Sequence, residues 1–235
     1  MNSPLWIVWL SALSVSAYAD EKYFDWVLER FEAKDEAAIA SYSVGQMNGE
    51  QHLAIIARRE DPQLVVFKGS PSGYTGVAQT FSLPLDSSLK IRKNSIFLET
   101  SFCHHGCTSE RYQFKYVDGV LRLIGVESQR DTNGCYYDEK NMSSNCEKHE
   151  VRSGNSYNLV ALSSICWLET TYVDDEAGTN RTPHKVPELF QPGGVKHKMA
   201  LQRIDLPRLE GFDLYNRFSL PKSCYFDYSR KLHKE

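Results

Sequence analysis

Polar and apolar residues alternate with a period of two in several parts of this chain, most clearly at residues 111–116. Tyrosine and phenylalanine occupy one face of that segment and charged or amide residues the other, which is typical of a half-buried strand. Asp118 and Gly119 follow. Because both central residues of a type I′ turn need a positive φ, this pair predicts a hairpin with a return strand at 120–127.

Other short runs of β-branched and aromatic residues are separated by turn residues. Parallel strands would need helical crossovers, which the sequence does not predict here, so we expect an antiparallel meander. The fold class is therefore mainly β, with sheets arranged as a sandwich or as propeller-like blades. The remaining predicted strands are 52–58, 64–68, 75–83, 95–102, 157–162 and 165–173.

Residues 20–40 have a different periodicity. Tyr23, Val27 and Phe31 recur at helical spacing, Asp20 can cap a helix, and an alanine-rich tail continues to Ala40. We expect one amphipathic helix whose aromatic stripe packs against a sheet.

Two segments lack clear alternation. Residues 129–154 are polar and contain two cysteines, which predicts a long disulfide-tied loop or a small hairpin. Residues 182–221 are interrupted by prolines and are expected to be extended, with little regular structure. The change near Gln129 leaves two organisations open, namely a single domain over residues 20–235 or two subdomains.

The N-terminal segment 4–19 is uncharged and apolar and ends in Ala17-Tyr18-Ala19. This pattern predicts a secretory signal peptide at 1–19, since the apolar run is shorter than the roughly 20 residues that span a bilayer. We expect a periplasmic protein with no stable membrane insertion after cleavage. An uncleaved N-terminal anchor is the alternative.

Cysteine content supports an oxidising compartment. Six cysteines in an exported chain predict three disulfides, although fifteen pairings are possible. Proximity favours two short-range pairs and leaves one long-range pair. The predicted disulfides are Cys103–Cys107, Cys135–Cys146 and Cys166–Cys224.

Charge excludes one class of function. The chain has 27 basic and 30 acidic residues with no long run of either sign. Nucleic-acid binding requires a basic surface that neutralises phosphates, so we expect no nucleic-acid partner.

The segment 103–107 reads Cys-His-His-Gly-Cys and contains the residue types that bind zinc. Four ligands within five residues can hardly surround one ion, so we expect a disulfide-pinned turn with His104 and His105 exposed. No motif predicts a catalytic residue, a metal site or a cofactor. Two alternatives stay open: an envelope hydrolase whose histidines and carboxylates meet only in the fold, and a ligand- or metal-binding module.

Loops rich in tyrosine, histidine and acidic residues, held by disulfides, are preorganised for a protein partner because little ordering is needed on binding. We therefore predict a protein-binding surface on these loops. Its candidate residues are His104, His105, Tyr136, Tyr137, Asp138, Asp174, Asp175 and Glu176.

The segment 111–127, RYQFKYVDGVLRLIGVE, resembles a hairpin of exported bacterial β-proteins. With its predicted signal peptide and disulfide-tied β body, the chain is also similar to the periplasmic immunity proteins that neutralise type VI secretion effectors, including lipases. This resemblance implies a non-enzymatic inhibitor that binds and blocks an envelope-targeting antibacterial toxin. It assigns no role to any residue.

Overall fold

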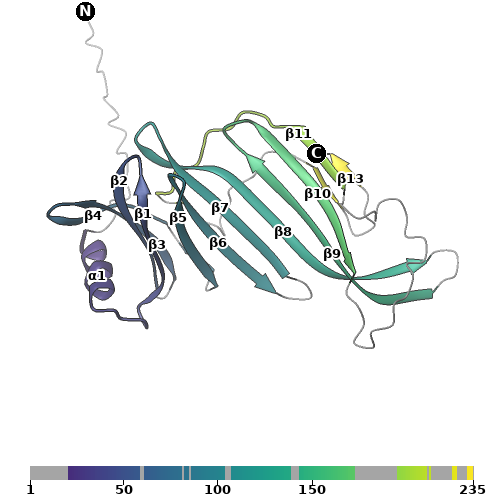
Figure 1. The fold of residues 1–235 in the computed structure, drawn as a ribbon, viewed down its shortest axis with the longest axis horizontal. Helices are drawn as coiled ribbons and strands as arrows, with labels where there is room; N and C mark the ends of the chain where they lie inside the picture. Colours follow the sequence, from purple (N-terminus) through teal and green to yellow (C-terminus); the bar gives the residue numbers. More distant parts are fainter. Residues whose placement is uncertain are drawn as a thin grey trace, which may run out of the picture.

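The structure is a computed structural model that describes residues 21–58, 61–80, 82–84, 86–103, 107–138, 143–172, 195–210, 212, 224–226 and 232–234. These residues form a helix, two large antiparallel sheets and a small two-stranded sheet (Figure 1). The predicted fold class, mainly β and antiparallel with an N-terminal helix and a disulfide, is confirmed.

The helix α1 spans Glu21–Glu32. The first sheet has the order β1-β2-β3-β4, with β1 at Ile39–Met47, β2 at Glu50–Ala57, β3 at Gln63–Ser70 and β4 at Gly73–Gln79. The second sheet has the order β11-β10-β9-β8-β7-β6-β5. Its strands are β5 (Ser87–Arg92), β6 (Ser95–Cys103), β7 (Cys107–Val117), β8 (Val120–Asp138), β9 (Ser143–Asn158), β10 (Ser163–Tyr172) and β11 (Val195–Ala200). The small sheet pairs β12 (Cys224–Phe226) with β13 (Leu232–Lys234).

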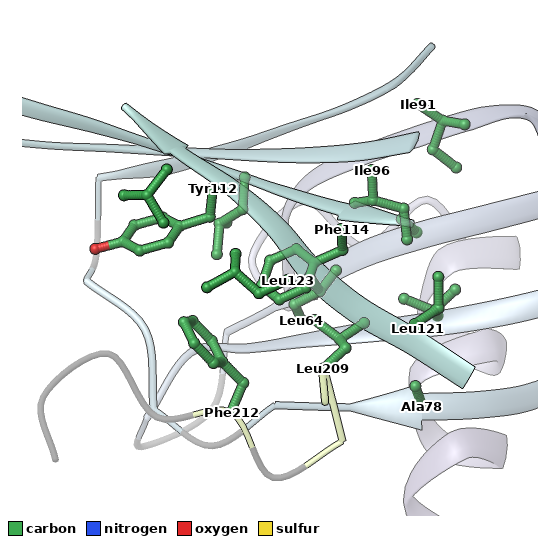
Figure 2. Close-up of a cluster of buried hydrophobic side chains, with 14 of the residues drawn as sticks. Leu64, Ala78, Ile91, Ile96, Tyr112, Phe114, Leu121, Leu123, Leu209 and Phe212 are labelled. Atoms are coloured by element: carbon green, nitrogen blue, oxygen red, sulfur yellow. The ribbon is translucent and has the colours of Figure 1, made fainter. Parts of the chain in front are cut away.

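The first sheet lies between α1 and the second sheet. Along β2, Leu53 and Ile55 belong to the cluster packed against the helix, whereas Ala54 and Ile56 belong to the cluster shared with the second sheet. Figure 2 shows this shared core, in which Leu64 from the first sheet meets Phe114 and Leu123 from the second. The two sheets thus form a sandwich, one of the two predicted arrangements.

The two sheets also meet edge to edge, along β1 and β5. The backbone N–H of Leu89 donates to Ser41 Oγ at 3.3 Å, and that of Ile91 donates to Ser43 Oγ at 2.9 Å. Gly45 continues the same row of small residues. We call this contact, made by Ser41, Ser43 and Gly45 against β5, the serine seam.

Adding a methyl group to the seam is expected to destabilise the protein. A Cβ atom at Gly45 would lie 2.6 Å from Cγ2 and 2.9 Å from Cβ of Ile91. Since overpacking of this kind costs about 1–3 kcal/mol, Gly45→Ala should lower the free energy of unfolding by that amount in urea titrations. When Ile91→Ala is added, the double variant should lose less free energy of unfolding than the two single variants lose in sum. Strictly additive losses would contradict this account.

The N-terminal helix is shorter than predicted. Its aromatic stripe does pack on the first sheet, with Tyr23 and Val27 buried. However, Lys34 adopts a φ of 55° and Asp35 Oδ1 accepts hydrogen bonds from the N–H groups of Ala37 and Ala38. These contacts turn the chain into β1, so the prediction of helix as far as Ala40 was wrong. Asp20 lies outside the described residues.

The predicted hairpin at Asp118-Gly119 is confirmed, with φ values of 51° and 76°. The loop predicted at 129–154 was wrong, because β8 and β9 pair through most of it and form a hairpin much longer than the small one considered. The strand predicted at 157–162 ends at Asn158, whose side chain accepts from the N–H of Ala161 in the following turn. Neither β1 nor β5 was predicted, and β11 lies within the segment 182–221.

The long-range disulfide is confirmed. Cys166 and Cys224 are bonded with Cα atoms 5.9 Å apart, and both residues are buried. The bond fastens β12 to β10. Cys107 is also disulfide-bonded, and its Cα lies opposite that of Cys103 in the sheet register. The side chains of Cys135 and Cys146 lie outside the described set, so that pairing stays a prediction.

The described part of the chain contains no helix with the length and apolar character required to cross a membrane.

Candidate functional site

The strand ends that carry or flank the predicted contact residues lie at one end of the second sheet. Cys103 pairs with Cys107, and Cys107 pairs with Asp131, so β6 and β7 end where β8 continues. At the same end, Tyr172 of β10 pairs with His149. We call this region, formed by Cys103, Cys107, Tyr172 and the part of the β8–β9 hairpin beyond Asp131, the hairpin end.

The hairpin end carries Tyr136, Tyr137 and Asp138 in β8. Their backbones pair with Asn145, Ser144 and Ser143 of β9, beyond the last residues that β7 and β10 contribute to the sheet. Figure 1 shows this hairpin extending past the neighbouring strands. The other five candidates lie outside the described residues, but the described strands lead directly to them. They are His104 and His105, after Cys103, and Asp174, Asp175 and Glu176, after Tyr172.

A groove of about 500 Å³ crosses the outer face of the second sheet, which points away from the first sheet. Its position follows from the alternation of the strands, since Leu98 and Tyr112 point into the core and their neighbours Glu99 and Arg111 point outward. The sequence did not single out this groove. Its lining residues on the outer face include Ser88, Glu99, Ser101, Ser109, Arg111, Glu127, Gln129 and Trp167.

A row of three charges crosses the groove floor. In the register of β6, β7 and β8, Arg111 lies between Glu99 and Glu127. Arg111 Nε donates to Glu99 at 2.7 Å and a terminal nitrogen donates to Glu127 at 2.9 Å. The hydrogen bond to Glu99 is the main cause that raises the pKa of the Arg111 guanidinium, while burial opposes it. All three side chains are roughly half exposed, so the pairs fix geometry more than they stabilise the fold.

One further carboxylate lines the same groove, that of Asp86, whereas Glu110 shares the inner face of β7 with Tyr112. The hydroxyl of Tyr112 donates to Glu110, and burial together with this contact raises the pKa of that tyrosine. The groove thus holds three carboxylates, of Asp86, Glu99 and Glu127, against the single guanidinium of Arg111.

An indole ring lies at the far side of the groove. Trp167 of β10 lies against Gly154 of β9, where an added Cβ would approach the indole to 2.5 Å. Glycine at position 154 is therefore required for the ring to lie against the sheet. The ring lines the groove beside Gln129.

A second polar cluster links the two sheets. His52 is fully buried, with Nδ1 3.0 Å from the carbonyl oxygen of Glu50. A carbonyl only accepts, so Nδ1 donates this hydrogen bond, and Nε2 shares a hydrogen bond with the Tyr116 hydroxyl at 3.1 Å. Burial, followed by the charge of Glu50, raises the pKa of Tyr116. Both ring nitrogens of His52 are thus engaged, and the pair acts as a hydrogen-bonded link between the first and second sheets.

Within the described ranges, no three histidine, cysteine or acidic side chains gather into a group that could hold a metal ion. The histidines of the predicted turn, His104 and His105, are not among these residues.

No protein-family model matches the chain, and no curated protein or solved structure shows significant similarity to it. Functional inference for this protein therefore depends on its own geometry and chemistry.

Proposed function

We propose that this protein is an extracytoplasmic binding protein whose partner is another protein, contacted at the hairpin end. The observation that carries the proposal is the reach of β8 and β9, 19 and 16 residues long, which pair beyond the strands on either side of them. An arm of this kind can enter a cleft of a partner that a flat sheet cannot reach. Its tip region carries two tyrosines and an aspartate, and tyrosine is enriched among the residues that dominate binding energy.

More specifically, we propose that the protein neutralises a toxin that acts in the cell envelope, such as a lipase, by occluding the active site of that toxin. The Cys166–Cys224 disulfide is compatible with an extracytoplasmic location. Backbone pairing across the hairpin lowers the ordering cost of inserting it, because the arm is already formed before binding. Steric exclusion of the substrate by the inserted arm requires no catalytic group in the inhibitor.

Affinity capture of the tagged protein from producing cells tests this function. Mass spectrometry should identify one stoichiometric partner, and the purified partner should have an envelope-degrading activity that the protein inhibits. Repeated captures that recover no stoichiometric partner would contradict the proposal, as would a partner whose activity is unchanged in the complex.

Removing the two tyrosines of the hairpin end should weaken the complex. Truncation of a dominant contact residue costs on the order of 2 kcal/mol, so Tyr136→Ser with Tyr137→Ser should raise the Kd at least about 30-fold in titration calorimetry. Tyr42→Ser provides a control, because Tyr42 is 59% exposed on β1 of the first sheet. Equal affinities for the double variant and the wild-type protein would place the interface elsewhere.

A further inference from the structure

We propose that the groove on the outer face of the second sheet binds a basic, extended segment of the protein partner, with an arginine or lysine side chain placed between Trp167 and Glu127. This inference rests on the proposed binding function and adds the chemistry that the partner must present.

The groove lies on a face of the second sheet that the described residues leave uncovered. The inner face of the second sheet is covered by the first sheet and by residues such as Leu209 and Phe212 (Figure 2). Among the described residues, no element packs over the outer face, where Ile165 is 38% exposed. The described residues therefore leave the groove open to a partner segment.

Charge selects a basic occupant. The guanidinium of Arg111 lies between Glu99 and Glu127 and is paired with both, so its single charge is directed at these two carboxylates and not at Asp86. Each of the two glutamates uses one oxygen in this contact, Oε1 of Glu99 and Oε2 of Glu127. A cationic side chain entering from the solvent would complement the remaining negative charge, whereas an acidic segment would be repelled.

Trp167 is a second and independent feature that favours a cation. Its indole is fixed against Gly154 and lines the groove, so its position is set before any ligand arrives. Tryptophan is the best aromatic partner for a lysine or arginine side chain, at about 0.5–1 kcal/mol when exposed and more when water is excluded. A cation held between an indole and a carboxylate satisfies both features of the groove.

The groove is also continuous with the hairpin end. Ser101, Ser109 and Gln129 form one row of its floor in the sheet register. This row lies two residues, or about 7 Å, from the row that contains Cys103, Cys107 and Asp131. A partner contacted by the β8–β9 arm can therefore extend a chain segment along the groove.

Fluorescence anisotropy with a labelled decapeptide of alternating arginine and serine tests the groove. The full-length protein should bind this peptide in a salt-sensitive manner, and should not bind the matching glutamate–serine peptide. Glu99→Gln with Glu127→Gln should weaken binding at least about tenfold, because glutamine can still accept from Arg111 but carries no charge. Trp167→Ala should weaken binding by about three- to fivefold.

Glu29→Gln with Glu32→Gln is the matched control, since it makes the same change in net charge at exposed positions of α1. If both double variants weakened peptide binding equally, net charge alone would explain binding and the proposed role of the groove would be wrong. Failure of the arginine peptide to bind the wild-type protein would also contradict this role. In the capture experiment, undiminished recovery of the partner by Glu99→Gln/Glu127→Gln would contradict the proposed role of the groove but not the proposed binding function. Recovery of no partner by the wild-type protein would contradict the proposed binding function.

Discussion

Replacing both Cys166 and Cys224 with alanine is expected to lower the free energy of unfolding by about 4 kcal/mol. The disulfide joins residues 58 positions apart, so it restricts a long loop of the unfolded chain, and the chain-entropy estimate for such a loop is close to this value. The buried position of both residues adds a smaller loss of packing. Because a typical domain has only about 5–15 kcal/mol of stability, the variant should unfold at clearly lower urea concentration.

Equilibrium urea unfolding, followed by circular dichroism under oxidising conditions, measures this loss. The wild-type protein in excess dithiothreitol is the comparison, and its stability should fall at least as far as that of the variant. A loss below about 1 kcal/mol would show that the loop between β10 and β12 is already restricted in the unfolded chain.

Truncation of Phe114 in the shared core is expected to have a similar effect, a loss of about 3–5 kcal/mol for Phe114→Ala. Phe114 is fully buried, lies opposite Ile96 and Leu123 in the sheet register, and meets the ring of Phe212 edge-on at 5.2 Å (Figure 2). The neighbouring strands cannot collapse into the space without breaking their register, so a cavity should remain.

Phe97→Ala is the matched control for this substitution. Phe97 lies on the adjacent strand β6 but points to the outer face, where it is partly exposed beneath the guanidinium of Arg92 at 4.7 Å. Its truncation should cost about 1 kcal/mol in the same urea titrations. Similar losses for the two phenylalanines would contradict the assignment of inner and outer faces.

Local sequence chemistry predicted the elements whose structure is set locally. Asp118-Gly119 adopts the positive φ values that its turn requires, and Tyr23 and Val27 are buried as their spacing indicated. The end of the helix was missed because the alanines near its predicted end have high helix propensity. Pairing of β1 with β2 overrides that preference from Ile39 onward.

The strand β1 was missed for a reason that the serine seam explains. Its inward face carries Ser41, Ser43 and Gly45, because β5 lies against it and leaves no room for larger side chains. Small residues on a half-buried face do not produce the alternation of apolar and polar residues by which a strand is recognised. The polar segment 129–154 was misread similarly, since its pairing depends on backbone hydrogen bonds rather than on an apolar face.

The candidate site was only partly predictable. The sequence placed Arg111 on a polar strand face, but a simple register from the Asp118-Gly119 turn would set it opposite Val126. The register shifts by one residue between Gln113 and Phe114, which instead brings Arg111 opposite Glu127. This bulge keeps Leu123 and Val126 both in the core, and it creates the row of charges across the groove. Its position depends on the whole sheet and could not be read from one strand.

The serine seam has a consequence for association between molecules. The strands β1 and β5 terminate their sheets, and a terminal strand normally offers unpaired backbone donors to which another chain can add. Here the outward N–H groups of Leu89 and Ile91 are already bound to hydroxyl oxygens of the same molecule. The serine seam therefore prevents another chain from adding to β5 through these two N–H groups. The acceptors are side-chain hydroxyls, so the two sheets are not joined into one continuous ladder.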